Sequence, residues 1–156
     1  MKNNKIKCTS AINDEKFDLS FDKLVIACGA ISNTFNIPGV KENAYFLKDI
    51  HDARRIRLKV IECFENAQQP GRTEEEQKDL LHFAVVGGGP TGIEFSAELH
   101  DFIVEDLTKI YPELMDKVQM TVYDVADKIL GSFDSSLSEY ATQKFSREGI
   151  NIKTGE

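Results

Sequence analysis

The chain has 156 residues, of which 41% are hydrophobic and 29% are charged, and its formal net charge is −7. This composition is typical of a soluble globular α/β protein of about one domain. The negative charge argues against nucleic-acid binding, which needs a basic surface, and against electrostatic docking on an anionic membrane. No apolar run approaches the roughly 18 residues of a membrane-spanning helix, and the N-terminus has neither a signal-peptide nor a transit-peptide pattern.

The cysteines and histidines show no metal-ligand spacing. No two cysteines form a Cys-x-x-Cys pair, and no two histidines lie three to five residues apart (Cys8, Cys28, Cys63; His51, His82, His100). Widely spaced cysteines are most simply explained by a reduced intracellular compartment. Each cysteine is therefore predicted to be a small buried apolar residue.

The first half of the chain predicts strands followed by a helix. Residues 5–11 and 17–21 have the pattern of short strands, and the apolar run 24–29 is typical of a strand buried on both faces. A loop with the turn signal Pro38-Gly39 follows. A helix should then begin near Asp49, which can cap it, and should end before Pro70-Gly71. Its predicted inner face shares one helical stripe: Ala53, Ile56, Val60, Phe64 and Ala67.

The pattern of predicted helices and strands changes between residues 70 and 80, which predicts a domain boundary there. Residues 73–76 form either the capping box of a short helix or a solvated acidic linker. Beyond them we expect a strand at 82–86, a helix from about 92 to 110, a strand at 118–124, a helix at 135–148 and a strand from 150. The predicted order is β-α-β-α-β. The inward residues are expected to be Ser96, Leu99, Ile103, Leu107 and Ile110 on the first helix, and Leu137, Tyr140, Ala141 and Phe145 on the second. Gly149 is expected just past the second helix.

The glycine motif between the strand at 82–86 and the next helix carries the chemistry. A Gly-x-Gly-x-x-Gly pattern has meaning only between a strand and a helix, and Gly87, Gly89 and Gly92 stand there. The first glycine permits a tight turn, the second lets a pyrophosphate approach the backbone, and the third lets the helix pack on the strand. The helix N-terminus then offers N–H groups to the diphosphate. The motif predicts a Rossmann-type site for a nicotinamide dinucleotide.

Two acidic residues accompany the motif. Asp124 closes the second strand of the Rossmann unit, where a carboxylate holds ribose hydroxyls and repels a 2′-phosphate, so NAD(H) is favoured over NADP(H). It lies further from the motif than usual, and a solvent-facing turn aspartate is the alternative. Glu94 either interacts with the dipole in the first helical turn or contacts the nicotinamide half of the ligand. The sequence contains no Ser/His/Asp triad or paired catalytic carboxylates, and hydride transfer needs neither, because the cofactors supply that chemistry.

Three stretches carry a more specific signal, at residues 21–30, 32–57 and 85–99. With residues 123–134, they resemble the type II (alternative, rotenone-insensitive) NADH dehydrogenases of fungal and plant mitochondria and of bacteria. The resemblance implies an α/β flavoprotein with two Rossmann-like dinucleotide-binding domains, one for FAD and one for NADH, present here incomplete. It places a partial FAD-binding domain at residues 1–69, a linker at 70–79 and a partial NADH-binding domain at 80–156.

The resemblance also implies site residues and partners. Gly87, Gly89, Gly92, Glu94 and Asp124 would contact NADH, and Ala27 and Gly29 would lie near FAD. The family passes hydride from NADH to FAD and then reduces ubiquinone without pumping protons, peripherally at the mitochondrial inner membrane. The flavin glycine motif and the membrane-associating segments of the family are expected to lie outside this chain. A homodimer is compatible with the resemblance.

Two other interpretations stay open. The chain could be an NADH-binding module or remnant without electron-transfer activity, which a missing flavin absorbance would reveal. It could also belong to another flavoprotein of the same architecture, such as an apoptosis-inducing-factor-like protein or a ferredoxin reductase. The stretch at residues 46–57 argues against the latter, and the cysteines do not form the redox pair of the disulphide reductases.

Overall fold

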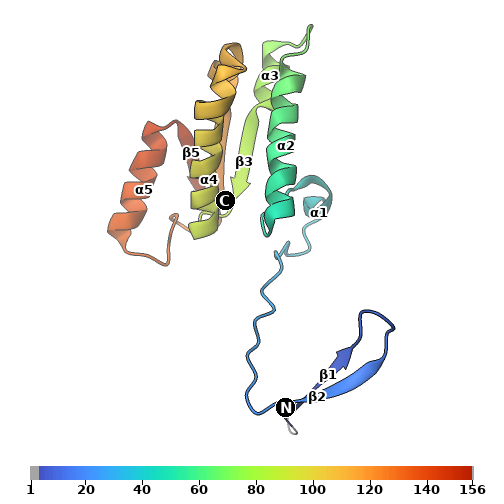
Figure 1. The fold of residues 1–156 in the computed structure, drawn as a ribbon. Helices are drawn as coiled ribbons and strands as arrows, with labels where there is room; N and C mark the ends of the chain where they lie inside the picture. Colours follow the sequence, from blue (N-terminus) through green and yellow to red (C-terminus); the bar gives the residue numbers. More distant parts are fainter. Residues whose placement is uncertain (1–3, 156) are drawn as a thin grey trace. The chain divides into compact units, whose positions relative to one another are not determined.

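A computed structural model describes residues 4–155, and Figure 1 shows its helices and strands in chain order. The chain divides into two compact units, Met1–Lys48 and Asp49–Glu156. The first unit contains a hairpin of β1 (Lys5–Thr9) and antiparallel β2 (Lys16–Ser20). These strands confirm the two predicted at 5–11 and 17–21. Both faces of the hairpin are largely solvent-exposed, so it buries little apolar surface within this unit.

The predicted buried strand at residues 24–29 is wrong. These residues form neither helix nor strand, and the side chains of Val25 and Ile26 are 86% and 68% exposed. A strand needs a neighbour for its backbone hydrogen bonds, and the described part of this unit provides none alongside it. The Pro38-Gly39 turn is confirmed, because Gly39 has a φ of 85° directly before the short helix α1 (Val40–Asn43).

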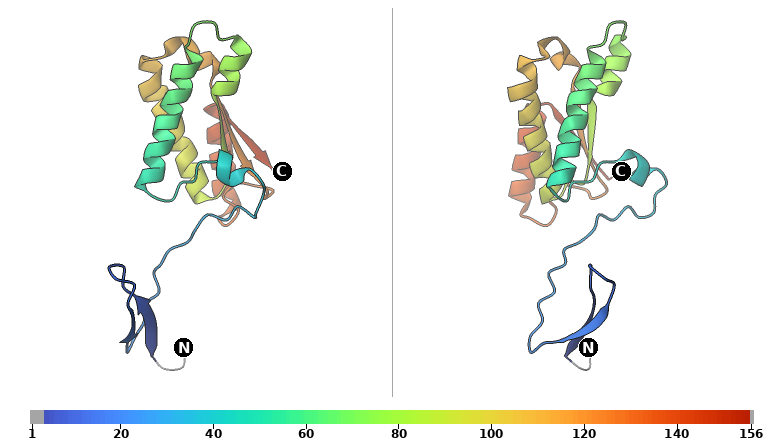
Figure 2. Two further views of the ribbon diagram at one scale, coloured as in Figure 1. Left: turned by 90° about the vertical axis from the view of Figure 1, so that its right-hand side faces the viewer. Right: turned by 45° about the vertical axis from the view of Figure 1, so that its right-hand side comes forward.

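The second unit is built on a parallel three-stranded sheet. Its strands are β3 (His82–Val86), β4 (Gln119–Asp124) and β5 (Ile150–Thr154), in the order β3-β4-β5. Val85 pairs with Val122, which pairs with Ile152. The helices α2, α4 and α5 all lie on one side of these strands (Figure 2). The predicted β-α-β-α-β unit is therefore confirmed.

Two capping boxes begin the helices that precede the sheet. Helix α2 (Ile50–Ala67) starts at Asp49, whose side chain accepts hydrogen bonds from backbone N–H groups of the first turn, while Asp52 reaches back. Helix α3 (Glu74–Leu80) starts at Thr73 with Glu76 in the reciprocal position. Each box satisfies N–H groups that a helix start leaves unpaired. The stretch at 73–76 thus forms a short helix and not an unstructured acidic linker.

The helix after the glycine motif begins earlier and winds differently than predicted. Helix α4 (Pro90–Asp101) starts at a proline, continues as a π-helical turn (η1, Phe102–Asp106), and tightens into two 3₁₀ segments (η2, Leu107–Lys109; η3, Pro112–Lys117). A π-turn shifts the phase of every later residue around the axis. Ile110 is consequently 61% exposed instead of inward, and Tyr111 is buried in its place.

Helix α5 (Ser135–Arg147) confirms only part of its predicted inner face, at Ala141 and Phe145. Ser138, Ala141 and Phe145 are buried, whereas Leu137 and Tyr140 are 42% and 65% exposed. The prediction ranked side chains by apolarity and did not expect a serine to be buried with a hydrogen-bond partner. Gly149 has a φ of 78° just past the helix, so the predicted helix end is confirmed.

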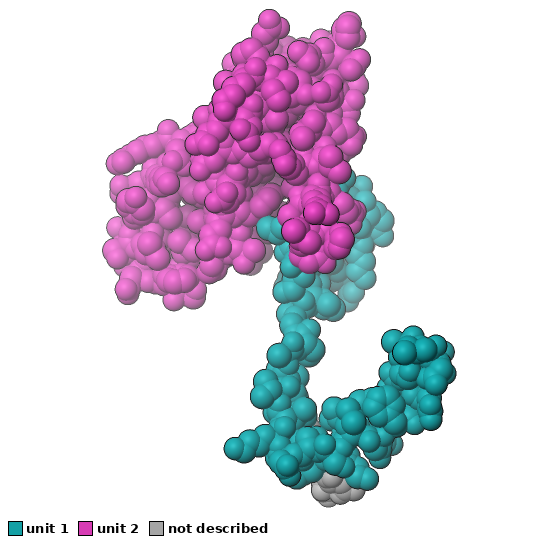
Figure 3. Space-filling view, viewed as in Figure 1, with its two compact units in different colours: residues 1–48 teal, residues 49–156 magenta. Residues whose placement is uncertain are grey.

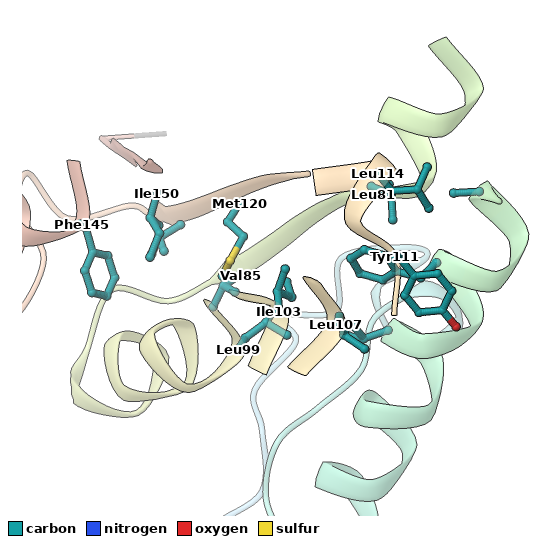
Figure 4. Packing of buried hydrophobic residues seen from close by; sticks show 14 residues of the cluster. Leu81, Val85, Leu99, Ile103, Leu107, Tyr111, Leu114, Met120, Phe145 and Ile150 are labelled. Carbon is teal, nitrogen blue, oxygen red and sulfur yellow. The ribbon is translucent and has the colours of Figure 1, made fainter. Parts of the chain in front are cut away.

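The core of the second unit lies between the sheet and its helices. Figure 4 shows strand residues such as Val85, Met120 and Ile150 beside Leu99 and Ile103. Another part of the core is aromatic. The ring of Phe64 on α2, which is completely buried, stacks on Phe83 with a centroid distance of 6.2 Å and on Tyr111 with a centroid distance of 5.3 Å. Helix α2 is therefore an integral part of this unit. Of its predicted inner face, only Ala53 is exposed.

The unit boundary in the structure falls between Lys48 and Asp49, as the colours of Figure 3 mark. The predicted scheme of residues 1–69, 70–79 and 80–156 concerns the domains of a longer protein and stays a prediction.

Within the described residues, no group of three or more His, Cys, Asp or Glu side chains could hold a metal ion. Likewise, none of the described helices is long and apolar enough to cross a membrane. The cysteines are free, and none is fully buried as predicted. Cys8 and Cys63 are half-buried, and Cys28 is exposed, since residues 24–29 have no sheet around them.

Candidate functional site

A tight turn at the carboxyl end of β3 forms the centre of the candidate site. Gly87 has a φ of 118°, a backbone conformation that L side chains rarely adopt. Its N–H donates a hydrogen bond of 2.8 Å to the carbonyl oxygen of Tyr123 on the neighbouring strand. The turn therefore leaves the sheet directly beside the end of β4, as the glycine motif predicts.

The third glycine of the motif allows very close packing. A Cβ atom at Gly92 would lie 1.8 Å from the carbonyl oxygen of Gly87 and 2.9 Å from its carbonyl carbon. Both atoms belong to the backbone, so no side-chain rotation could relieve the contact. Only a glycine lets the first turn of α4 approach the end of β3 this closely, which is the role expected of this position.

The second glycine instead faces open space. A Cβ at Gly89 would have no other atom within 4 Å, and this residue is the N-cap of α4 with extended backbone. No side chain caps this helix, and Pro90 occupies its first turn. The N–H groups at this helix start therefore face a surface that has room for a ligand. An anion is the natural occupant, because these groups and the helix dipole carry partial positive charge.

Gly88, which stands between the first two glycines of the motif, has a role that the motif did not indicate. A Cβ at Gly88 would lie 2.8 Å from Cγ2 of Ile129 and 2.9 Å from Oδ2 of Asp124. Its N–H donates to the Asp124 carboxylate, and its carbonyl oxygen accepts a hydrogen bond of 2.7 Å from the N–H of Leu130. Gly88 is thus packed against the end of β4 and the chain that follows it. The only hint of this in the sequence is that a variable position of the motif is a glycine.

Asp124 lies where the sequence placed it, at the carboxyl end of β4 and beside the glycine turn. One carboxylate oxygen accepts from Gly88, and the other accepts from the N–H of Ala126 at 2.7 Å. A carboxylate has about four acceptor directions, so two remain after these bonds. They are available to ribose hydroxyls. The long spacing from the motif is explained by the π-turn and 3₁₀ segments at residues 102–117.

Glu94 is the fifth residue of α4, and its side chain is exposed. Because the helix begins at Pro90, no acidic residue lies in its first turn, and the dipole interaction decays within that turn. The helix-dipole interpretation of Glu94 is therefore wrong, and a ligand contact stays a prediction. Ala27 and Gly29 lie in the exposed stretch of the first unit, and the described residues of that unit build no flavin cradle around them. Their FAD contact also stays a prediction.

Two half-open hollows of the second unit lie away from the glycine turn. One, of about 470 Å³, is lined by residues such as Gln77 and Tyr111, and another, of about 330 Å³, by residues such as His100 and Ile150. Neither is lined by a residue of the glycine turn. With open space at Gly89, the candidate site is a surface at the carboxyl ends of the strands, the edge where doubly wound α/β folds bind ligands.

Comparison with known proteins identifies the family. A family profile described as pyridine nucleotide-disulphide oxidoreductase matches residues 1–156. The chain belongs to this family. The glycine turn, the uncapped helix and the strand-end aspartate described above are thus features of a pyridine nucleotide-disulphide oxidoreductase chain, and the predicted Rossmann-like α/β flavoprotein fold is confirmed.

Individual relatives narrow the resemblance. The chain is 57% identical over 90% of its length to the external alternative NAD(P)H-ubiquinone oxidoreductase B3, mitochondrial, of Arabidopsis thaliana. It is 46% identical over 98% of its length to a probable NADH dehydrogenase of Dictyostelium discoideum. The structure of NDH2 from Plasmodium falciparum in complex with NADH matches 97% of the chain with 39% identity and a TM-score of 0.85. The resemblance to type II NADH dehydrogenases is confirmed.

These relatives are considerably longer than the chain. It spans 24% and 34% of the two curated relatives and 30% of the Plasmodium structure. The expectation that the chain is an incomplete flavoprotein agrees with this coverage.

Proposed function

We propose that the glycine turn and Asp124 bind the ADP half of NADH. The observation that carries this proposal is the arrangement at the carboxyl edge of the sheet, where open space at Gly89, an uncapped helix start and the Asp124 carboxylate lie together. The helix start would hold the diphosphate, and Asp124 would accept hydrogen bonds from ribose hydroxyls. Gly87 and Gly92 shape the turn, and Glu94 would contact the nicotinamide half.

For the whole protein we propose a non-proton-pumping NADH:ubiquinone oxidoreductase. Hydride would pass from NADH to FAD, and the reduced flavin would reduce ubiquinone to ubiquinol. The names of the Arabidopsis and Dictyostelium relatives support this activity. Ala27 and Gly29 would lie near FAD in the complete flavin domain, with residues 1–69 belonging to that domain and residues 80–156 to the NADH domain.

The location and assembly of the whole protein are part of the same proposal. Relatives from Arabidopsis thaliana are named as mitochondrial. We propose a peripheral position at the mitochondrial inner membrane, with contact through segments outside this chain. A homodimer is the assembly to test. The name of the Arabidopsis relative includes both NADH and NADPH, so the proposed preference for NADH rests on the Asp124 carboxylate, which would repel a 2′-phosphate.

A calorimetric titration of the purified chain with NADH and NADPH tests the site. We expect NADH to bind more tightly than NADPH. Gly89→Val should abolish NADH binding, because its side chain would occupy the open space that the pyrophosphate needs. Ile110→Val, at an exposed position of the same unit away from the turn, is a matched control and should bind as the unsubstituted chain does.

Two results would contradict the proposal. Unchanged NADH affinity in Gly89→Val would place the ligand elsewhere, and tighter binding of NADPH would remove Asp124 from the ribose site. Visible absorbance of the purified chain distinguishes the interpretations of the chain itself. Bound flavin would support an assembled flavin site, whereas NADH binding without flavin would support a binding module.

A further inference from the structure

The connection between β4 and α5, residues 125–134, encloses one residue of the glycine turn completely. The N–H of Gly88 donates to Asp124, the last residue of β4, and its carbonyl oxygen accepts a hydrogen bond from the N–H of Leu130 in the middle of the connection. Ile129 covers the Cα of Gly88 so closely that no Cβ would fit. Both polar backbone groups of Gly88 are thus paired, one with the last residue of β4 and the other with the connection that follows it. The conformation of the turn therefore depends on where this connection lies.

The middle of the connection is itself held in an unfavourable conformation. Leu130 has a φ of 52°, in the left-handed region that branched apolar residues rarely adopt. Such a conformation persists only when surrounding contacts impose it. Here Ile129 and Leu130 are buried with Ala141 in a small apolar cluster, against which Ile93 of the glycine helix also packs. The connection, α5 and the glycine helix therefore form one packed assembly.

A buried serine of α5 anchors this connection. Ser138 is 4% exposed, and its hydroxyl donates a hydrogen bond of 2.7 Å to the carbonyl oxygen of Ile129. Removing the hydroxyl would leave that carbonyl without this donor in a site closed to water, which favours movement of the segment. Movement of Ile129 and Leu130 would release the two contacts that they make with Gly88.

We propose that Ser138 is a positioning residue for the nucleotide-binding turn, acting through Ile129 and Leu130 on Gly88. It does not touch the ligand. It holds the connection in the one conformation that keeps the turn ready for the diphosphate. This inference rests on the proposed NADH site, but its structural part concerns only the conformation of the turn.

The test compares two hydroxyl deletions on the same helix. Thr142 also donates a hydrogen bond, at 2.8 Å, but to the carbonyl oxygen of Ser138 within α5, so Thr142→Val removes a hydroxyl without touching the connection. We expect Ser138→Ala to weaken NADH binding of the full chain roughly tenfold, because a turn that is competent one-tenth of the time binds with a tenfold higher apparent Kd. Thr142→Val should bind as the unsubstituted chain does. Ser138→Thr keeps the donor and should restore most of the affinity.

Amide hydrogen exchange supplies a readout that does not require NADH. In the unsubstituted chain the N–H groups of Gly88 and Leu130 should exchange much more slowly than that of Gly89, which faces open space. In Ser138→Ala both should lose protection, and in Thr142→Val both should keep it. Loss of protection at both amides together with weaker binding in Ser138→Ala alone supports the proposal.

Other results would overturn it. Rapid exchange of Gly88 and Leu130 in the unsubstituted chain would mean that the connection does not hold the turn. Equal affinity in Ser138→Ala and Thr142→Val would mean that Ser138 does not act on the site. If the unsubstituted chain bound no NADH, the proposed function would fail by itself, and amide exchange alone would then decide whether Ser138 positions the turn.

Discussion

Substitution of Gly92 by alanine tests the geometry of the turn most directly. The new Cβ would lie 1.8 Å from the carbonyl oxygen of Gly87 and would have to retreat by about 1.2 Å to reach the 3.0 Å that real contacts respect. Forced overpacking costs roughly 1–3 kcal/mol, and the upper end applies because backbone is the obstacle. Alanine recovers about 1 kcal/mol of helix propensity over glycine. We therefore expect a loss of about 2 kcal/mol in the free energy of unfolding.

The assay is thermal unfolding followed by circular dichroism. For a unit of this size, about 4 °C per kcal/mol predicts that Gly92→Ala melts about 8 °C below the unsubstituted chain. Gly89→Ala is the matched control, since its Cβ meets open space. Its small loss of N-cap preference is offset by a smaller entropy of the unfolded chain, so its melting temperature should barely change. Equal melting temperatures for Gly92→Ala and Gly89→Ala would refute the close approach.

Two further predictions concern a carboxylate and a phenol. Asp124→Ser should raise NADPH affinity relative to NADH affinity about fivefold, since about 1 kcal/mol of repulsion disappears. It should also weaken the binding of both nucleotides, because the N–H groups of Gly88 and Ala126 lose their acceptor. An unchanged ratio of NADPH to NADH affinity in calorimetry would refute the ribose assignment. The pKa of Tyr111 is raised above its ordinary 10.0 by the hydrogen bond to Glu65, then by burial and by the charge of Glu65. This tyrosine therefore contributes stability below pH 10, and that stability is lost as pH rises through its folded pKa. Urea unfolding between pH 8 and 11 should therefore depend on pH more steeply in the unsubstituted chain than in Tyr111→Phe, and identical dependence would refute the linkage.

Some functional residues could be named from the sequence because their roles are local. Gly87 and Gly92 are required by the backbone conformation and close approach of one short turn, and a motif of fixed spacing encodes both. The capping box at Asp49 is likewise encoded within four residues. Asp124 could be placed because a buried strand ends there, and parallel strands bring their carboxyl ends to one edge.

Other features depended on contacts between segments distant in sequence. The apolar run at 24–29 has the composition of a buried strand, but a strand exists only with a hydrogen-bonding neighbour. Ile110 was misplaced because a π-turn, which leaves no clear trace in apolar periodicity, rotated the residues after it.

The sequence by itself determined the order of elements, the glycine turn and the acidic residue at the strand end, because these follow from local periodicity and backbone sterics. Only the tertiary structure revealed how the turn is held. Gly88, Leu130 and Ser138 are brought together by the packing of α5 against the sheet, and the hydrogen bond between Gly88 and Leu130 joins residues 42 positions apart. No local pattern encodes such contacts, since burial and pairing are properties of the assembled fold.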